Sequence, residues 1–274
     1  MNPRLLIHRV KINEPQLPEA DYKKEKLTAG FVLRLVRFLA QDGKTYYGDA
    51  ILPAGMTDIA KATKANIIQG DIFGTHTVTN QVASITRLLS PLPPTKIQTV
   101  RCLGLNYAAH AHESKMPLPT YPVVFHKPKT AIAGPHDVIP IPSMAQEVLG
   151  LDYECELVII IGKSGRDIPA SSALEHVLGY SVGDDVSHRE WQLKRGGGQW
   201  SLGKGFDGWA PMGPGIVSSN IIKDPQALKI STKLNGRVVQ ESSTADMIFG
   251  VKETIAFLSR GTTLLAGDVI FTGT

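Results

Sequence analysis

The chain has 274 residues, of which 42% are hydrophobic and 20% charged, and its formal net charge is +4. This composition excludes a disordered or fibrous chain, and the longest aliphatic run, residues 157–161, is far shorter than the roughly 20 residues that a membrane helix needs. The basic residues form no continuous run that would favour a nucleic-acid partner. We therefore expect a globular protein with neither a membrane nor a nucleic acid as its partner.

The first ninety residues predict a small N-terminal α+β module. Strands are expected over residues 5–10, 31–39 and 45–52, and helices over residues 58–68 and 81–89. The proline-rich segment 90–95 cannot continue a helix, because proline lacks an N–H and forces the preceding residue into an extended conformation. We place a domain boundary there, so that the module comprises residues 1–95.

Residues 96–274 predict a larger, β-rich domain. Helices are expected over residues 173–178, 188–195 and 252–259, and strands over residues 99–105, 123–126, 138–141, 153–161, 180–186, 228–234 and 238–241. The dipeptide Asn235-Gly236 predicts a type I′ hairpin between the last two strands. Because strand mostly follows strand, we expect an α+β, β-rich fold with a rolled, mixed sheet rather than a repeated βαβ pattern.

The cysteine content and the N-terminus bear on location. The chain has two cysteines, Cys102 and Cys155, which are too few for a disulfide framework and favour a reducing, intracellular compartment. The opening residues contain too short an apolar stretch for a secretory signal, and the acidic residues that follow argue against a transit peptide. We therefore expect a cytoplasmic protein, with a mitochondrial location as the alternative.

The sharpest local pattern is a pair of carboxylates at the start of an aliphatic strand. Glu154 and Glu156 lie two residues apart, about 7 Å along an extended strand, so their side chains point to the same face. Two such groups need compensation by a divalent cation, protonation, arginine partners or solvent at the strand end. They also lie in an acidic stretch, since positions 147–190 hold nine acidic and three basic residues.

Two further patterns could belong to an active site. Asp184 and Asp185 end an expected strand, where an aspartate could cap the following helix or add a third carboxylate to a Mg²⁺ site. His110 and Glu113 are spaced i, i+3, so in a helical turn they could hydrogen-bond and form a general base, or they could make only a surface contact.

A glycine-rich segment precedes Lys204. Residues 198–205, GQWSLGKG, match the beginning of a phosphate-binding P-loop, but Gly205 stands where a serine or threonine should hold Mg²⁺. We therefore expect a loop that delivers Lys204 into a pocket, and a nucleotide-binding protein is the disfavoured alternative.

Six ordered blocks of the sequence resemble the fumarylacetoacetate hydrolase family, from about residue 99 to residue 274. The blocks are GLNYAAHAHE, VVFHKP, DYECELVIIIGKSGRDI, GYSVGDDVSHREWQ, GGGQWSLGKGFDGWAPMGPGIV and GDVIFTGT. They are most similar to the domain-containing members of the acylpyruvase and oxaloacetate decarboxylase type. The resemblance implies a mixed β-roll or sandwich of the family's C-terminal type, a homodimer, and Mg²⁺ or Mn²⁺ as the cofactor.

The resemblance also implies a role for nine residues, carried over position by position. The metal ligands are Glu154, Glu156 and Asp185; the catalytic residues are His110, Glu113 and Lys204; and the substrate contacts are Arg189, Gln192 and Thr274. In this assignment His110 and Glu113 match a water-activating dyad, and Lys204 matches the lysine beside the reacting carbonyl. Family members continue beyond the TGT block, so we expect the C-terminal edge of the domain to be missing from this chain.

The implied activity is metal-dependent hydrolysis of a carbon–carbon bond in a small acidic 2-oxo or 1,3-dicarbonyl substrate, an acylpyruvate or a compound like fumarylacetoacetate. The metal would act as a Lewis acid on the oxo acid, and Lys204 would stabilise the developing enolate. Decarboxylation of an oxaloacetate-like acid and isomerisation or tautomerisation are alternatives on the same scaffold. A catalytically silent binding protein is the non-enzymatic alternative, and the intact set of candidate residues argues against it.

Overall fold

The structure, a computed structural model, describes residues 7–12 and 32–274. The strands of that part are β1 (Ile7–Ile12), β2 (Arg34–Ala40), β3 (Thr45–Ile51), β4 (Lys64–Gly70), β5 (His76–Leu88), β6 (Val100–Gly104), β7 (Val123–Lys127), β8 (Ile132–Ala133), β9 (Leu151–Asp152), β10 (Cys155–Ile161), β11 (Gly165–Arg166), β12 (Val177–Asp184), β13 (Ser187–His188), β14 (Ala210–Ser218), β15 (Lys229–Leu234), β16 (Arg237–Ser243), β17 (Thr263–Leu264) and β18 (Val269–Phe271). The α-helices are α2 (Ala108–Glu113), α3 (Ser143–Gln146), α4 (Ser201–Lys204) and α5 (Val251–Leu258). Shorter helical turns are the 3₁₀ helices η1 (Ile59–Lys61), η2 (Lys129–Ala131), η3 (Ala170–His176) and η5 (Thr244–Asp246) and the π-helix η4 (Trp191–Arg195).

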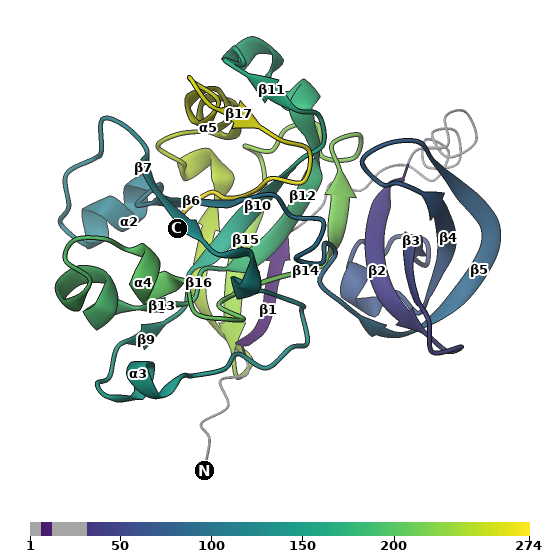
Figure 1. Ribbon diagram of the computed structural model, residues 1–274, viewed down its shortest axis with the longest axis horizontal. Helices are drawn as coiled ribbons and strands as arrows, with labels where there is room; N and C mark the ends of the chain where they lie inside the picture. Colours follow the sequence, from purple (N-terminus) through teal and green to yellow (C-terminus); the bar gives the residue numbers. More distant parts are fainter. Residues whose placement is uncertain (1–6, 13–31) are drawn as a thin grey trace.

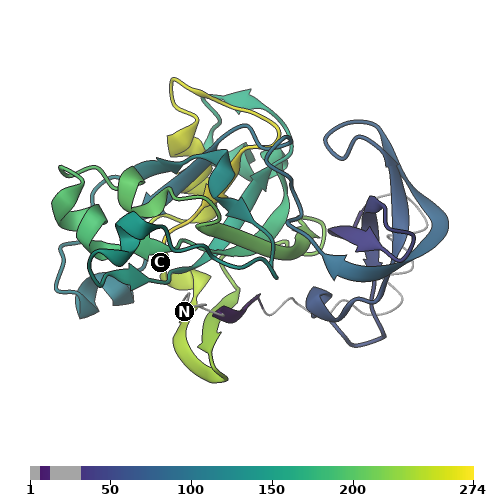
Figure 2. The same cartoon turned by 60° about the horizontal axis from the view of Figure 1, so that its bottom comes forward.

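Four strands near the N-terminus close on themselves. β2 pairs with both β3 and β5, and β4 pairs with both β3 and β5, so each of the four has two neighbours within the group. They form a small antiparallel barrel, which lies at the right of Figure 1 and stays apart from the rest when the molecule is turned in Figure 2. β2 also pairs with β14, and this pairing joins the barrel to the larger sheet.

The two helices expected in the N-terminal module are wrong. Residues 64–70 form β4 and residues 76–88 form β5, and within the described residues of these two stretches only η1 is helical. β5 is rich in β-branched residues, whose restricted side-chain rotamers favour strands over helices. Barrel closure also gives both strands hydrogen-bonded neighbours, and this outweighs the helix-like spacing of their apolar residues.

The first described strand belongs to a different sheet from the barrel. β1 pairs with β15, which pairs with β16, and the three strands form a separate sheet. Positions 5 and 6 of the strand expected over residues 5–10, and position 31 of the next expected strand, lie outside the described residues. The division at residue 95 stays a prediction.

Strand β10 lies in the interior of the large sheet, between β12 and β18. All seven of its residues are buried. Leu157, Ile159 and Ile161 pack into one apolar cluster, whereas Val158 and Ile160 pack into another. The core therefore covers both faces of this strand, which explains its unbroken aliphatic run and fixes the place of the glutamates at its beginning.

The other expected elements of residues 96–274 have mixed outcomes. The expected strands that correspond to β6, β7, β10, β12, β15 and β16 are confirmed with shifted bounds, and so is the helix that corresponds to α5. Asn235 and Gly236 have φ angles of 51° and 82°, as a type I′ turn requires. The strand expected at 138–141 is wrong, since that stretch has no strand assignment and contains Pro140.

The two remaining expected helices differ in kind and in their bounds. Residues 170–176 form the 3₁₀ helix η3, and residues 191–195 form the π-helix η4. β14 was not expected from the sequence. The α+β, β-rich fold class is confirmed, because strands supply the large sheet and the helices stand around it (Figure 1). Within the described residues, none of the helices combines the length and the apolar character needed to cross a membrane.

Candidate active site

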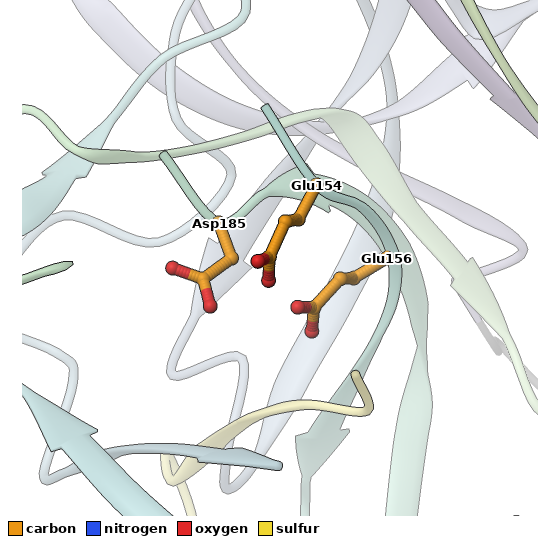
Figure 3. A group of neighbouring side chains, drawn as sticks. All are labelled: Glu154, Glu156 and Asp185. Carbon is orange, nitrogen blue, oxygen red and sulfur yellow. The ribbon is translucent and has the colours of Figure 1, made fainter. Parts of the chain in front are cut away.

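Three carboxylates meet at the ends of two neighbouring strands. Glu154 directly precedes β10, Glu156 lies within it, and Asp185 directly follows β12. The two strands are antiparallel, with Cys155 opposite Asp184, so the beginning of one meets the end of the other. One carboxylate oxygen from each of the three residues lies within 4.8 Å of the others, and all three residues are buried. Figure 3 shows the three side chains converging on a common space.

Two buried lysines compensate part of this negative charge. Lys204 Nζ donates hydrogen bonds to Glu154 Oε2 at 2.9 Å and to Asp185 Oδ2 at 2.7 Å. It also donates to Ser187 Oγ at 2.6 Å. Lys127 Nζ lies 2.7 Å from the other oxygen of Asp185, Oδ1. Burial on its own raises the pKa of Asp185, but the two lysines outweigh burial and lower this pKa below its usual value, so Asp185 is ionised.

Glu156 is the least compensated of the three carboxylates. Its Oε2 accepts a hydrogen bond from the backbone N–H of Gly273 at 2.7 Å, whereas its Oε1 is buried without a hydrogen-bond partner among the described residues. Burial, with Asp185 and Glu154 adding to it, raises the pKa of Glu156 well above its usual value. A divalent cation would satisfy this oxygen, and a set of carboxylate ligands suits Mg²⁺ or Mn²⁺. The residues present therefore fit a divalent metal ion.

Arg189 connects the carboxylates to the second expected substrate contact. Its Nη1 donates to Glu154 Oε1, and also to Gln192 Oε1 at 2.8 Å. Its Nε donates to Asp152 Oδ2 at 2.8 Å, and Gln192 is buried. The structure thus brings Arg189 and Gln192 together at the edge of the three-carboxylate group.

Lys204 reaches the carboxylates from the C-terminal end of α4. A Cβ at the preceding residue, Gly203, would lie 2.4 Å from the backbone nitrogen of Gln192, so only glycine allows this close approach. This close packing of α4 against Gln192 leaves only 1% of the Lys204 surface exposed. Because its ammonium is bonded to carboxylates, Lys204 is not placed as the lysine of a phosphate-binding loop would be.

The other three expected site residues line an adjoining pocket of about 290 Å³. His110 and Glu113 come from α2, and Thr274 is the last residue of the chain. Cys155 also lines this pocket, and the residue before Thr274 donates to Glu156, so the pocket borders the carboxylates. No hydrogen bond joins His110 to Glu113 in the part of the chain that the structure describes. The nine expected residues thus fall into two adjoining groups, and their individual roles stay predictions.

The sequence analysis missed three residues of the site. Lys127 contacts Asp185, Ser187 contacts Lys204, and Asp152 contacts Arg189. Lys127 lies in the VVFHKP block, so the resemblance offered a signal for it. Spacing alone offered none, because 58 positions separate Lys127 from Asp185 and only the strand pairings bring them together.

Comparison with known proteins shows which family the larger part of the chain matches. Residues 99–274 match the family described as "Fumarylacetoacetate (FAA) hydrolase C-terminal". A Dictyostelium discoideum protein named "Fumarylacetoacetate hydrolase domain-containing protein 2 homolog" is 46% identical over 196 residues, which cover 69% of this chain and 62% of that protein. A Bos taurus protein named "Oxaloacetate tautomerase FAHD2A, mitochondrial" is 46% identical over 182 residues, which cover 66% of this chain and 57% of that protein. The chain thus spans about three fifths of the length of these relatives.

A solved structure extends the similarity to the fold. The crystal structure named 2-hydroxyhepta-2,4-diene-1,7-dioate isomerase, from Mycobacterium marinum, has a TM-score of 0.73 to this chain and is 36% identical to it. The similarity covers 88% of this chain and 87% of the other. The family match covers more than half of the chain, and it contains all nine expected site residues. The protein is therefore a member of the fumarylacetoacetate hydrolase family.

Proposed function

We propose that the protein is a metal-dependent enzyme that interconverts the keto and enol forms of a small acidic 2-oxo compound, such as oxaloacetate. The observation that carries this proposal is the buried group of Glu154, Glu156 and Asp185. Within it, Glu156 Oε1 has no hydrogen-bond partner among the described residues, and the ammonium of Lys204 lies at hydrogen-bond distance from Asp185. The names of the bovine relative, a tautomerase, and of the mycobacterial structure, an isomerase, support the same class of reaction.

Each residue beside the carboxylates has a task in this reaction. A divalent cation held by the three carboxylates would act as a Lewis acid on the 2-oxo carbonyl group. Arg189 and Gln192 would orient the carboxylate of the substrate. Lys204 would stabilise the negative charge that develops on the enolate oxygen. Burial lowers the pKa of Lys204, but Asp185 and Glu154 outweigh burial and raise it, so Lys204 remains protonated and acts as a fixed cation rather than a base.

Proton transfer to and from carbon needs another group, and His110 is suited to it. It lies in the pocket that borders the carboxylates, and imidazole is the side chain whose ordinary pKa lies nearest to neutral pH. We assign this proton transfer to His110.

Hydrolysis of a carbon–carbon bond is the second candidate function. His110 and Glu113 line one pocket, which favours a shared role in activating water. Two of the relatives named above are a tautomerase and an isomerase by name, and therefore we rank tautomerisation first. Decarboxylation would use the same enolate and the same cations without an attacking water.

A substrate screen tests the proposal. The enol form of oxaloacetate is diluted into buffer with Mg²⁺, with Mn²⁺ or with EDTA, and the decay of its ultraviolet absorbance is followed. Carbon dioxide release from oxaloacetate and cleavage of acylpyruvates and fumarylacetoacetate are measured in parallel. Metal-dependent acceleration of enol decay that disappears in Glu154→Gln supports the proposal, with Glu147→Gln as the matched control, because Glu147 is an exposed partner of Arg195. Faster metal-dependent cleavage than enol decay would favour hydrolysis, and no metal-dependent turnover of any substrate would reject the proposed function.

The remaining expectations stay proposals. We propose a homodimer that binds a small oxo acid and no nucleic acid. The cytoplasmic location also stays a prediction, and the mitochondrial location named for the bovine relative stands beside it as the alternative.

A further inference from the structure

Gln240, on the hairpin of β15 and β16, contacts the strand that carries the glutamates. It is the cross-strand partner of Thr232, so the two side chains lie on the same face of the hairpin. Gln240 Oε1 accepts a hydrogen bond from the hydroxyl of Thr232 at 3.1 Å. The same oxygen accepts one from the backbone N–H of Cys155, the residue between Glu154 and Glu156, at 3.0 Å.

These two bonds fix the orientation of the Gln240 carboxamide. A backbone N–H can only donate, so a flipped carboxamide would place its own N–H groups against the N–H of Cys155. The oxygen must therefore face Cys155, and the nitrogen Nε2 must point the other way. Nε2 has no hydrogen-bond partner among the described residues and is not one of the buried unpartnered atoms. It therefore retains access to solvent, and Gln240 lines the pocket that also contains His110 and Thr274.

Gln240 does not serve to activate the thiol of Cys155. Gln240 accepts its hydrogen bond from the backbone N–H of Cys155 and not from the thiol, which is buried. Holding the backbone of Cys155 requires only the carboxamide oxygen. The two N–H donors of Nε2 are thus left for a ligand in the pocket.

We propose that Gln240 is a specificity-determining residue whose Nε2 donates a hydrogen bond to an acceptor oxygen on the part of the substrate beyond its 2-oxo acid group. This inference rests on the proposed function, because it requires the 2-oxo acid end to bind beside the carboxylates. The pocket would then select 2,4-dioxo acids and 2-oxo-1,4-dicarboxylic acids such as oxaloacetate over plain 2-oxo acids of the same length. Among the described residues, the lining of this pocket includes no lysine or arginine. The Gln240 carboxamide is a neutral donor, which can serve a ketone as well as a carboxylate.

The experiment compares Gln240→Glu with Gln240→Leu. Glutamate keeps an oxygen for the Cys155 N–H and for Thr232, but it replaces the donor Nε2 with an acceptor. Leucine removes both the structural acceptor and the donor. Arg237→Gln, at the exposed end of the same hairpin, changes the net charge by the same amount as Gln240→Glu and is the matched control.

Binding of two ligands with the same carbon skeleton, 2,4-dioxopentanoate and 2-oxopentanoate, is measured by calorimetry with saturating Mg²⁺. The wild type and Arg237→Gln should bind the dioxo acid more tightly, by about 3- to 10-fold, the range of one neutral hydrogen bond. Gln240→Glu should lose this preference, which is measured as the ratio of its affinities for the two ligands. Both ligands carry one carboxylate, so an effect of the added charge on Mg²⁺ binding or on oxo-acid binding applies to both and cancels in the ratio.

The outcomes separate the inference from the proposed function. If Gln240→Glu retains the preference and only Gln240→Leu is impaired, Gln240 holds β10 in place and does not contact the substrate, and the inference is wrong. A wild type that shows no preference contradicts the inference as well, although the proposed function still stands. If the wild type binds neither oxo acid with Mg²⁺ and turns over neither, the proposed function and the inference both fail.

Discussion

Replacing Glu156 with glutamine should stabilise the protein in EDTA and remove its response to Mg²⁺. The amide oxygen can still accept the hydrogen bond from Gly273, so the change removes a buried charge and little else. Burial and the neighbouring carboxylates raise the pKa of Glu156 in the folded protein, so the folded state binds its proton more tightly than the unfolded chain does. The stability of the metal-free wild type therefore falls as the pH rises above the ordinary glutamate value of about 4.3, by about 1.4 kcal/mol for each pH unit until the raised pKa is reached.

Glutamine does not titrate, so the stability of the variant does not fall with pH through this group. In EDTA, the thermal midpoint of Glu156→Gln should exceed that of the wild type by several degrees at about pH 7.5 and by less at about pH 5.5, since 1 kcal/mol shifts the midpoint by about 2 to 4 °C in domains of this size. Mg²⁺ at about 100 times its dissociation constant should add about 2.7 kcal/mol to the wild type and little to the variant. A variant that melts below the wild type in EDTA at both pH values would refute this account of the site.

Three further predictions concern single residues. Lys204→Met should lower kcat by about 10²-fold and raise KM much less, because a cation facing the enolate acts mainly in the transition state; steady-state kinetics with oxaloacetate would contradict this if kcat were unchanged. His110→Ala should slow the enol-to-keto conversion of oxaloacetate by about 10²-fold or more and leave metal-dependent decarboxylation less affected, and equal large losses in both assays would show that His110 acts in substrate binding instead. Gly203→Ala should lower the free energy of unfolding by about 1 to 3 kcal/mol, because its Cβ would lie 2.4 Å from the backbone nitrogen of Gln192. Gly74→Ala, whose Cβ would lie 3.5 Å from its nearest neighbour, is the control in the same thermal unfolding experiment. Equal effects at both positions would contradict the argument from close approach.

The three-carboxylate group could be predicted in part from the sequence, because it depends on local patterns. Glu154 and Glu156 share a face through the two-residue period of a strand, and Asp185 follows the next long buried strand. The partners of these groups come from distant segments. Lys127 and Gln240 reach the same strand end only because β7 and the β15–β16 hairpin pack there. No sequence spacing predicts that either residue lies at the site.

The N-terminal strands show where local patterns mislead. Apolar residues in 58–68 and 81–89 fit a helical spacing as well as a strand, and propensity alone does not decide between them. The decision comes from pairing, because β2, β3, β4 and β5 complete a closed ring in which each strand has two neighbours. Such a ring depends on contacts that a local window of sequence does not contain.

The pairing of β1 with β15 has a consequence for the order in which the molecule can be completed. Ile7 lies opposite Leu234 and Ile12 opposite Ile230, so more than two hundred further residues must be synthesised after β1 before its partner strand exists. Contacts so distant in sequence form slowly, and an unpaired strand edge is prone to pair with another chain in the meantime. The neighbouring strand β16 carries Gln240, so the pocket that it lines can assume its final form only after β16 has been synthesised. A nascent chain that stops short of this hairpin would hold Glu154, Glu156 and Asp185 without the wall that Gln240 contributes to the pocket.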